Sequence, residues 1–185
     1  MGEIDDAIER ADQEGFTRQP PKTLQARINF LMKQLKTTKA VAAELGVSQR
    51  SVERYRKGER KHPPKAIAER IDAAVRARWQ PQVRRRRRKQ AATTRGITVE
   101  TRARFGYTAP IGTTDDGRFR RLTVHLPPTY AQRLFDAREA GAGDQQMRQI
   151  IAEGFKEIYF QDGGARALGL SDVTLNDIDY LDLDY

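Results

Sequence analysis

Hydrophobic residues recur at helical spacing through much of the first half of the chain. Three segments place an apolar residue every three or four positions, which is the pattern of a helix with one buried face. These positions are Ile4, Ala7, Ile8 and Ala11; Leu24, Ile28, Leu31 and Leu35; and Ile67, Ile71 and Val75. Gly15 is expected to end the first helix, and Pro20-Pro21 to form a linker after it. The first half is therefore predicted to be helical.

Residues 38–57, between the second and third of these segments, have the pattern of a helix-turn-helix. Ala42 is small enough for two helices to cross closely, and Gly46 supplies a turn position without a Cβ atom. Ser48 is a favoured N-cap residue for the second helix of the motif. The apolar anchors are Val41, Leu45, Val47 and Val52.

The second helix of this motif would expose polar side chains that are suited to contacting DNA. They are Gln49, Arg50, Glu53, Arg54 and Lys57. Residues near the start of a recognition helix reach base edges in the major groove, where Arg can bond to guanine and Gln to adenine. The alternative is a helical hairpin whose polar face is only solvated. The two arginines on the exposed face favour DNA binding.

After residue 95 the pattern changes to that of strands. Residues 97–107 and 118–126 are rich in β-branched and aromatic residues and predict two strands. A long hairpin loop, TAPIGTTDDG, at residues 108–117 is expected to join them. Residues 128–140 and 145–160 then predict two helices. The expected apolar positions of the second strand are Phe119, Leu122, Val124 and Leu126.

Two features of this second half leave alternatives open. The strand RLTVHL and the two helices after it resemble a ribbon-helix-helix unit, in which paired strands come from two subunits. In that arrangement Arg121, Thr123 and His125 would face outward. An ordinary α+β domain is favoured, because another strand precedes this one in the same chain. The tail at residues 176–185 alternates acids with large apolar groups, which fits either an edge strand or an acidic docking segment.

The expected fold class is α+β, with a helical helix-turn-helix domain followed by a small domain of a β-hairpin and helices. Residues 1–81 are assigned to the helical DNA-binding domain. Residues 82–95 are assigned to a basic linker, and residues 96–185 to an α+β domain with an acidic C-terminal tail. The sequence leaves a homo-oligomer open.

The charge distribution points to a polyanionic partner. The formal net charge is +9, and residues 22–95 carry 22 Lys and Arg against 5 Asp and Glu, whereas both ends are acidic. The acidic ends are expected to fold back on this block or to bind another protein.

Residues 84–89 are six consecutive cations. Such charges repel one another, so this run is expected to be extended, or helical only on a polyanion, and to act as a phosphate-binding arm. Its alternative is a solvated linker. The run is Arg84, Arg85, Arg86, Arg87, Arg88 and Lys89.

Other composition features narrow the class of protein. The chain has no cysteine and only two histidines, His62 and His125, far apart in sequence, so no metal site is expected. It has no apolar run of membrane-spanning length and no apolar signal region near its start. These features predict a cytoplasmic protein without a membrane partner.

The sequence resembles the telomere terminal proteins of linear actinobacterial chromosomes and plasmids, the Tpg family. The resemblance is densest over FLMKQLKTTKAVAAELGVSQRSVERYRKGERKHPPKAIAERIDAAVRARWQP, which begins at Phe30. It resumes at ITVETRARFGYTAPIGTTDDGRFRRLTVHLPP and includes the C-terminal DIDYLDLDY. It covers nearly the whole chain, and the segments up to Arg18 and near residues 142–149 are less similar.

The resemblance implies a nucleoid-associated replication protein that primes DNA synthesis and stays covalently bound to the 5′ end of linear DNA. It implies telomeric DNA, a telomere-associated protein and a cellular DNA polymerase as partners. The chain would then be an acceptor substrate and not an enzyme. It would need no cofactor of its own, since the polymerase supplies the divalent metal ions.

The family's linking threonine maps onto Thr114, the second threonine of TAPIGTTDDG. Asp115 and Asp116 could orient its hydroxyl or help to hold a metal ion, although the same letters are also good turn chemistry. The rival hydroxyls are Thr113, Tyr107, Tyr180 and Tyr185. The rival functions are a helix-turn-helix transcription regulator that binds DNA reversibly, and a nucleic-acid enzyme that uses Asp115 and Asp116 as metal ligands.

Overall fold

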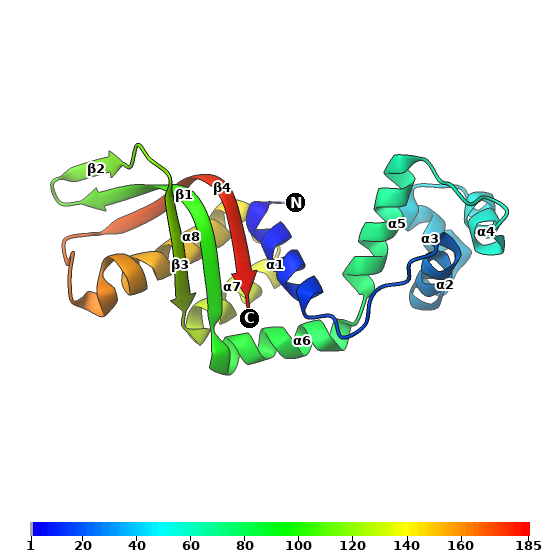
Figure 1. The fold of residues 1–185 in the computed structure, drawn as a ribbon, viewed down its shortest axis with the longest axis horizontal. Coiled ribbons are helices and arrows are strands. Elements are labelled where there is room, and N and C mark those ends of the chain that lie inside the picture. Colours follow the sequence, from blue (N-terminus) through cyan, green and yellow to red (C-terminus); the bar gives the residue numbers. More distant parts are fainter. Residues whose placement is uncertain (1) are drawn as a thin grey trace. The chain divides into compact units, whose positions relative to one another are not determined.

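The computed structural model describes residues 2–185 and divides the chain into two compact units (Figure 1). The helical unit is Phe16–Pro81, and the sheet unit combines the residues up to Gly15 with Gln82–Tyr185. The fold class is α+β, as expected. The boundaries differ from the expected ones, because the first helix belongs to the sheet unit and residues 82–95 form helical structure within that unit.

Four helices build the helical unit around one apolar core. They are α2 (Leu24–Leu35), α3 (Thr38–Leu45), α4 (Gln49–Lys57) and α5 (Lys65–Arg78). The apolar positions at helical spacing are the ones that become buried, which confirms the predicted helices. The fully buried side chains include Ile28, Leu31, Val41, Leu45, Val52, Ile71 and Val75. A core of this kind fixes α4 against α2 and α3, so the outer face of α4 is presented on a rigid support.

The turn between α3 and α4 has the local structure that the sequence predicts. The Thr37 hydroxyl accepts a hydrogen bond from the Ala40 amide at 3.1 Å, and the Ser48 hydroxyl accepts one from the Ser51 amide at 3.2 Å. Both side chains cap otherwise unpaired amides at the start of a helix. Gly46 ends α3 with a φ of 64°, a left-handed conformation in which a Cβ atom would be strained.

The sheet unit contains helices and an antiparallel sheet of four strands. Its helices are α1 (Glu3–Glu14), α6 (Pro81–Gln90), α7 (Pro128–Glu139) and α8 (Asp144–Gly154). Shorter helical turns are η1 (Ala91–Arg95), η2 (Phe155–Phe160) and η3 (Asp162–Gly164). The strands are β1 (Ile97–Ala109), β2 (Gly112–Asp115), β3 (Arg120–Leu126) and β4 (Asp172–Asp184).

Strand β1 is the central strand, and every other strand pairs with it in antiparallel fashion. β4 pairs with residues 98–108 of β1. β3 pairs with residues 97–103 and β2 with residues 106–109, so these two strands share the opposite edge of β1. The tail is therefore a strand of the sheet, the first of its two expected alternatives.

Helices α1, α7 and α8 lie on one face of the sheet, and the other face is left open (Figure 1). β3 alternates with period two, so Leu122, Val124 and Leu126 are buried while Arg121, Thr123 and His125 are exposed on the open face. Phe119 was expected among the apolar positions, which is wrong. It precedes β3, has the opposite parity and is 36% exposed.

The strand RLTVHL pairs with β1 of its own chain. A ribbon-helix-helix unit would instead pair it with the same strand of a second subunit. The sheet unit is therefore the ordinary α+β arrangement that the preceding strand favours.

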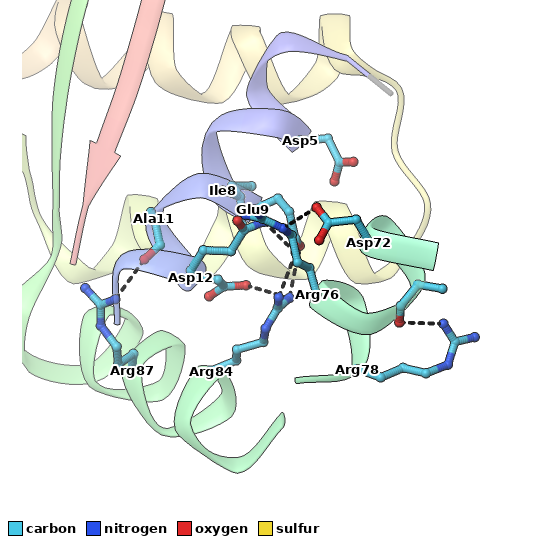
Figure 2. Close-up of polar contacts among 12 residues, drawn as sticks. Asp5, Ile8, Glu9, Ala11, Asp12, Asp72, Arg76, Arg78, Arg84 and Arg87 are labelled. Carbon is cyan, nitrogen blue, oxygen red and sulfur yellow. Dashed lines mark hydrogen bonds and ion pairs between the residues drawn. The ribbon is translucent and has the colours of Figure 1, made fainter. Parts of the chain in front are cut away.

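A buried cluster of charges joins α1 to α6 inside the sheet unit (Figure 2). Asp12 is fully buried, Arg84 lies 3.5 Å from its carboxylate, and Arg88 also pairs with it. Arg84 donates two hydrogen bonds to Glu9, at 2.7 and 3.0 Å. The Tyr185 hydroxyl donates a further bond to Asp12 at 2.7 Å. The buried charges of Asp12 and Arg84 are thus balanced by each other and by the partly buried Glu9 and Arg88.

The pKa values of two members follow from this arrangement. Burial disfavours the ionised form of Glu9, but the hydrogen bonds and the charge of Arg84 outweigh it, so the pKa of Glu9 is lowered. Burial likewise disfavours the charged form of Arg88, but its hydrogen bond to Asp12, the charge of Asp12 and the contact with Tyr185 together outweigh burial and raise the pKa of Arg88. Both shifts favour the ionised partners that the cluster needs.

Asp12→Ala is expected to lower the free energy of unfolding of the sheet unit by about 3–5 kcal/mol, since it leaves buried guanidinium groups without their carboxylate. The matched control is Asp182→Ala, which removes an exposed pair with Arg10 and should cost at most about 1 kcal/mol. Hydrogen exchange of the β1 amides in increasing urea measures both. Equal losses in the two variants would contradict the structural role of Asp12.

Candidate nucleic-acid interface and priming hairpin

Helix α4 exposes the side chains that the sequence assigns to DNA contact. Two buried residues, Val52 and Tyr55, anchor its inner side to the helical core. The only ion pair of its outer arginines within residues 2–185 joins Arg54 to Glu59 at 3.9 Å, with both side chains about half exposed. A pair of this kind is worth little and does not prevent a groove contact. The exposed side chains are Gln49, Arg50, Glu53, Arg54 and Lys57.

The turn that follows α4 adds cations beside this face. Gly58 ends α4 with a φ of 76°, and its amide donates to the Tyr55 carbonyl oxygen at 3.2 Å. The turn then presents side chains that can contact phosphates on either side of a groove. They are Lys61 and His62 of the turn itself and Lys57 and Lys65 at the helix ends on either side of it, all exposed.

The run of six cations differs from its expected form, because α6 is a helix within the folded sheet unit and has two distinct faces. Arg84, Arg87 and Arg88 lie three and four positions apart and therefore share the face toward α1. Arg87 donates to the Ala11 carbonyl oxygen at 2.8 Å (Figure 2) and also bonds to the Tyr185 backbone oxygen. The acids of α1 offset the repulsion that would otherwise extend the run. Arg85, Arg86 and Lys89 remain exposed on the outer face.

The expected loop at residues 108–117 is largely a β-hairpin. β2 pairs with the end of β1, and only the residues around Pro110 and Ile111 form the turn. Thr113 lies opposite Thr108, and their hydroxyl oxygens are 3.3 Å apart. Thr114 lies opposite Tyr107 and thus on the other face of the hairpin.

The two threonines differ in what their hydroxyls contact. Both residues are exposed. Within residues 2–185 the Thr114 hydroxyl has no hydrogen-bond partner, whereas that of Thr113 is shared with Thr108. Of the two exposed hydroxyls, that of Thr114 is therefore the one without an internal hydrogen bond among the described residues.

Asp115 and Asp116 brace the hairpin. Asp115 accepts a hydrogen bond at 2.9 Å from the Asn176 side chain on β4. Asp116 accepts one at 2.5 Å from Arg120, which lowers the pKa of that carboxyl, and its amide donates to the Phe105 carbonyl oxygen at 2.8 Å. The two carboxylates bind to the protein's own donors, which does not support the expectation that they orient the hydroxyl or hold a metal ion. In residues 2–185 no three His, Asp or Glu side chains gather as a metal site would need.

Asn176 and Arg120 are braces that sequence patterns do not reveal, because each contact depends on the register of the strands. Gly106 makes the first one sterically feasible. A Cβ atom there would lie 2.4 Å from the Thr174 hydroxyl oxygen and 2.8 Å from Asp115. The hydrogen bond between Asn176 and Asp115 therefore requires glycine at position 106, because a larger residue would clash with these side chains.

The rival tyrosine hydroxyls are less available than Thr114. The Tyr107 hydroxyl is buried without a hydrogen-bond partner among the described residues, and burial raises its pKa. The Tyr180 hydroxyl donates to Glu100 at 2.9 Å. The Tyr185 hydroxyl belongs to the buried cluster with Asp12, where burial raises its pKa strongly.

The chain matches no protein-family model, no curated protein and no solved structure. Within residues 2–185, no helix combines the length and the apolar character needed to cross a membrane.

Replacing Arg50 and Arg54 together with Ala is expected to weaken duplex binding about ten-fold or more, because each good arginine–base contact contributes about 1–3 kcal/mol. Both side chains are exposed, so the fold should be unchanged by circular dichroism. Fluorescence anisotropy with labelled duplexes measures the affinity. Wild-type affinity for every duplex tested would contradict a recognition role for α4.

The two faces of α6 are expected to behave differently on substitution. Changing Arg85, Arg86 and Lys89 to Gln should reduce the salt dependence of DNA binding by up to about 2–3 in the log–log slope, without loss of stability. The matched control changes Arg84, Arg87 and Arg88 to Gln. It removes the same charge but should destabilise the sheet unit. An unchanged salt slope in the first variant would show that the outer face does not contact phosphate.

Proposed function

We propose that this chain is a protein primer for the replication of linear DNA ends, joined covalently to the 5′ terminus through Thr114. The resemblance to telomere terminal proteins supplies the class of function. The observation that supports it best is the exposed Thr114 hydroxyl, which has no hydrogen-bond partner within residues 2–185 and lies on a braced hairpin. Of the hydroxyls weighed from the sequence, the others are shared, donated or buried.

The chemistry asks little of the chain itself. The Thr114 oxygen forms a bond to the α-phosphorus of a deoxynucleoside triphosphate, and the bond from that phosphorus to pyrophosphate breaks. The hydroxyl proton is lost to the polymerase site or to solvent. The two metal ions that activate the attacking and leaving oxygens belong to the DNA polymerase. The chain is then an acceptor and not an enzyme, and the attached nucleotide supplies the next 3′-hydroxyl.

A β-hairpin suits this task because a primer must place its hydroxyl accurately in another protein's active site. Paired strands hold the hydroxyl within a narrow range of positions, which lowers the entropy lost on docking. The Asp115–Asn176 and Asp116–Arg120 contacts tie β2 to the rest of the sheet. Nucleotide transfer to Thr114 would then take place at a fixed position relative to the rest of the sheet.

The helical unit has the complementary role of holding the DNA end. Its α4 face and the turn after it present cations and groove-reading side chains, as described above. In this proposal a telomere-associated protein brings the chain to the 3′ overhang, and the complex acts in the cytoplasm at the nucleoid. The competing function is a transcription regulator, which would use the same helix-turn-helix reversibly and would leave Thr114 unmodified.

Thr114→Val is expected to abolish the transfer of labelled deoxynucleotide to the chain, since it keeps the side-chain shape but removes the nucleophile. Thr113→Val is the matched control on the neighbouring residue and should retain transfer. Thr114→Ser should retain part of it. The assay combines the full chain with DNA polymerase, divalent metal and telomeric template, and detects label that survives denaturation.

Duplex binding should be the same in all three variants, because Thr113 and Thr114 lie in the sheet unit and not in α4. If Thr114→Val is still labelled while Thr113→Val is not, the assignment of the hydroxyl is wrong. If no variant and no wild-type protein is labelled, the regulator is the better interpretation.

A further inference from the structure

An aromatic ring is exposed on the open face of the sheet, close to the priming hairpin. Within the described residues 2–185, the exposed large hydrophobic side chains are Ile111, Phe119 and Leu168. Phe119 is the aromatic residue of the three, and two arginines lie over its ring. It lies three residues beyond Asp116, whose contact with Arg120 closes the base of the hairpin.

Two arginines of β1 lie against this ring. The guanidinium carbons of Arg102 and Arg104 are 5.0 and 4.8 Å from the centre of the Phe119 ring, within the range of cation–π attraction. Both arginines alternate with the buried Ala103 and therefore project from the open face. Arg121 is paired with Arg102 in the register of β1 and β3 and extends the group, with its side chain 71% exposed.

Strand β4 supplies acids that hold these arginines in the absence of a ligand. Asp179 lies 2.5 Å from Arg102, and Asp177 lies 3.3 Å from Arg104. The side chains of all four residues are between 43% and 63% exposed. Exposed ion pairs of this kind are weak and exchange readily for another anion. Arg121 is held in the same way by Glu100, at 2.6 Å.

We propose that this face binds single-stranded DNA. Arg102 and Arg104 leave the Phe119 ring, Asp177 and Asp179 for neighbouring phosphates, and one base stacks on the ring in their place. A single strand is the fitting ligand because its bases are free to stack on an aromatic ring, whereas those of a duplex are covered by their neighbours. Arginines beside an aromatic ring on a sheet provide both the stacking and the phosphate contact that such a strand needs.

The choice of DNA rests on the proposed function, in which a template strand must lie near Thr114. The chain connects β2 to Phe119 through only three residues, Asp116, Gly117 and Arg118. A strand held at Phe119 would therefore lie at the base of the hairpin, and it would reach Thr114, which lies on the other face with Tyr107, around the β2 edge of the sheet. The binding itself needs no polymerase and can be tested alone.

The first experiment measures anisotropy of a labelled oligothymidylate of about 16 nucleotides, in the length range that one such surface binds. It uses the full chain with Arg50→Ala and Arg54→Ala, which removes the helix-turn-helix contribution. Adding Phe119→Ala should weaken binding about five-fold or more, since one stacked base contributes about 1–3 kcal/mol. An abasic oligonucleotide of equal length should bind the parent protein weakly and be insensitive to Phe119→Ala.

Arginine substitutions provide a matched pair. Arg102→Ala should weaken oligothymidylate binding, whereas Arg133→Ala should not. Arg133 is an equally exposed arginine that lies over the Tyr130 ring and pairs with Glu153 at 2.5 Å, but it is on α7 and not on the open face. Equal losses of oligothymidylate affinity in the two variants would show that the effect comes from the total positive charge and not from the open face. That result would overturn the proposal.

The acids of β4 give a test in the opposite direction. Asp177→Asn with Asp179→Asn should strengthen oligothymidylate binding, because it removes the groups that compete with phosphate for Arg102 and Arg104. The control is Asp182→Asn with Asp184→Asn on the same strand, whose partners are Arg10 and Arg87. The first pair should strengthen binding several-fold more than the second. An equal gain, or none, would overturn the proposal.

The outcomes separate this site from the priming role. If Phe119→Ala binds oligothymidylate as the parent does, the single-strand site is wrong, whatever happens to nucleotide transfer at Thr114. If Phe119→Ala loses binding while wild-type protein is never labelled, the site stands and the priming role fails. If polyglutamate competes as well as the oligonucleotide does, the face is a general anion surface and the proposal is wrong.

Discussion

The buried pairing of Asp12 with Arg84 and Arg88 is the interaction on which the organisation of the sheet unit depends. It attaches the acidic helix α1 to the sheet unit, although residues 16–81 separate α1 from the rest of that unit in sequence. It also neutralises part of the cationic run at residues 84–89, which allows the run to be an ordered helix. It also fixes the end of β4, because the Tyr185 hydroxyl bonds to the same carboxylate. Removing either guanidinium partner would leave the Asp12 carboxylate insufficiently neutralised and lower the stability of the sheet unit. The contacts of the cluster therefore depend on one another.

The same cluster determines which cations are left for DNA. Three of the six consecutive cations, Arg84, Arg87 and Arg88, contact α1 within the sheet unit. Counting all six as phosphate contacts would therefore overestimate the DNA-binding charge of the run. On the open face of the sheet, β4 acids engage the arginines again, but there the pairs are exposed and weak. Burial thus separates arginines that hold the structure from arginines that can exchange their partner for a phosphate.

Local patterns predicted the helical unit well, because its helices, caps and turn each depend on residues within one or two turns of one another. They also predicted the burial alternation of β3. They failed where the outcome depends on contacts between distant segments: the place of α1, the structure of α6 and the braces from Asn176 and Arg120. Phe119 shows the limit clearly, since its apolar character suggested burial while its parity along the strand places it on the open face.

The division into units also changes what the net charge means. The helical unit carries 16 Lys and Arg against 5 Asp and Glu, whereas the sheet unit carries 18 against 20. Long-range attraction to DNA must therefore come mainly from the helical unit. A sheet unit with a slight negative charge holds nucleic acid through local contacts, which are stacking, arginine–phosphate pairs and the exposed cations of α6. Such contacts act once the DNA is already close, which suits a unit whose hairpin must meet one strand end and not any duplex.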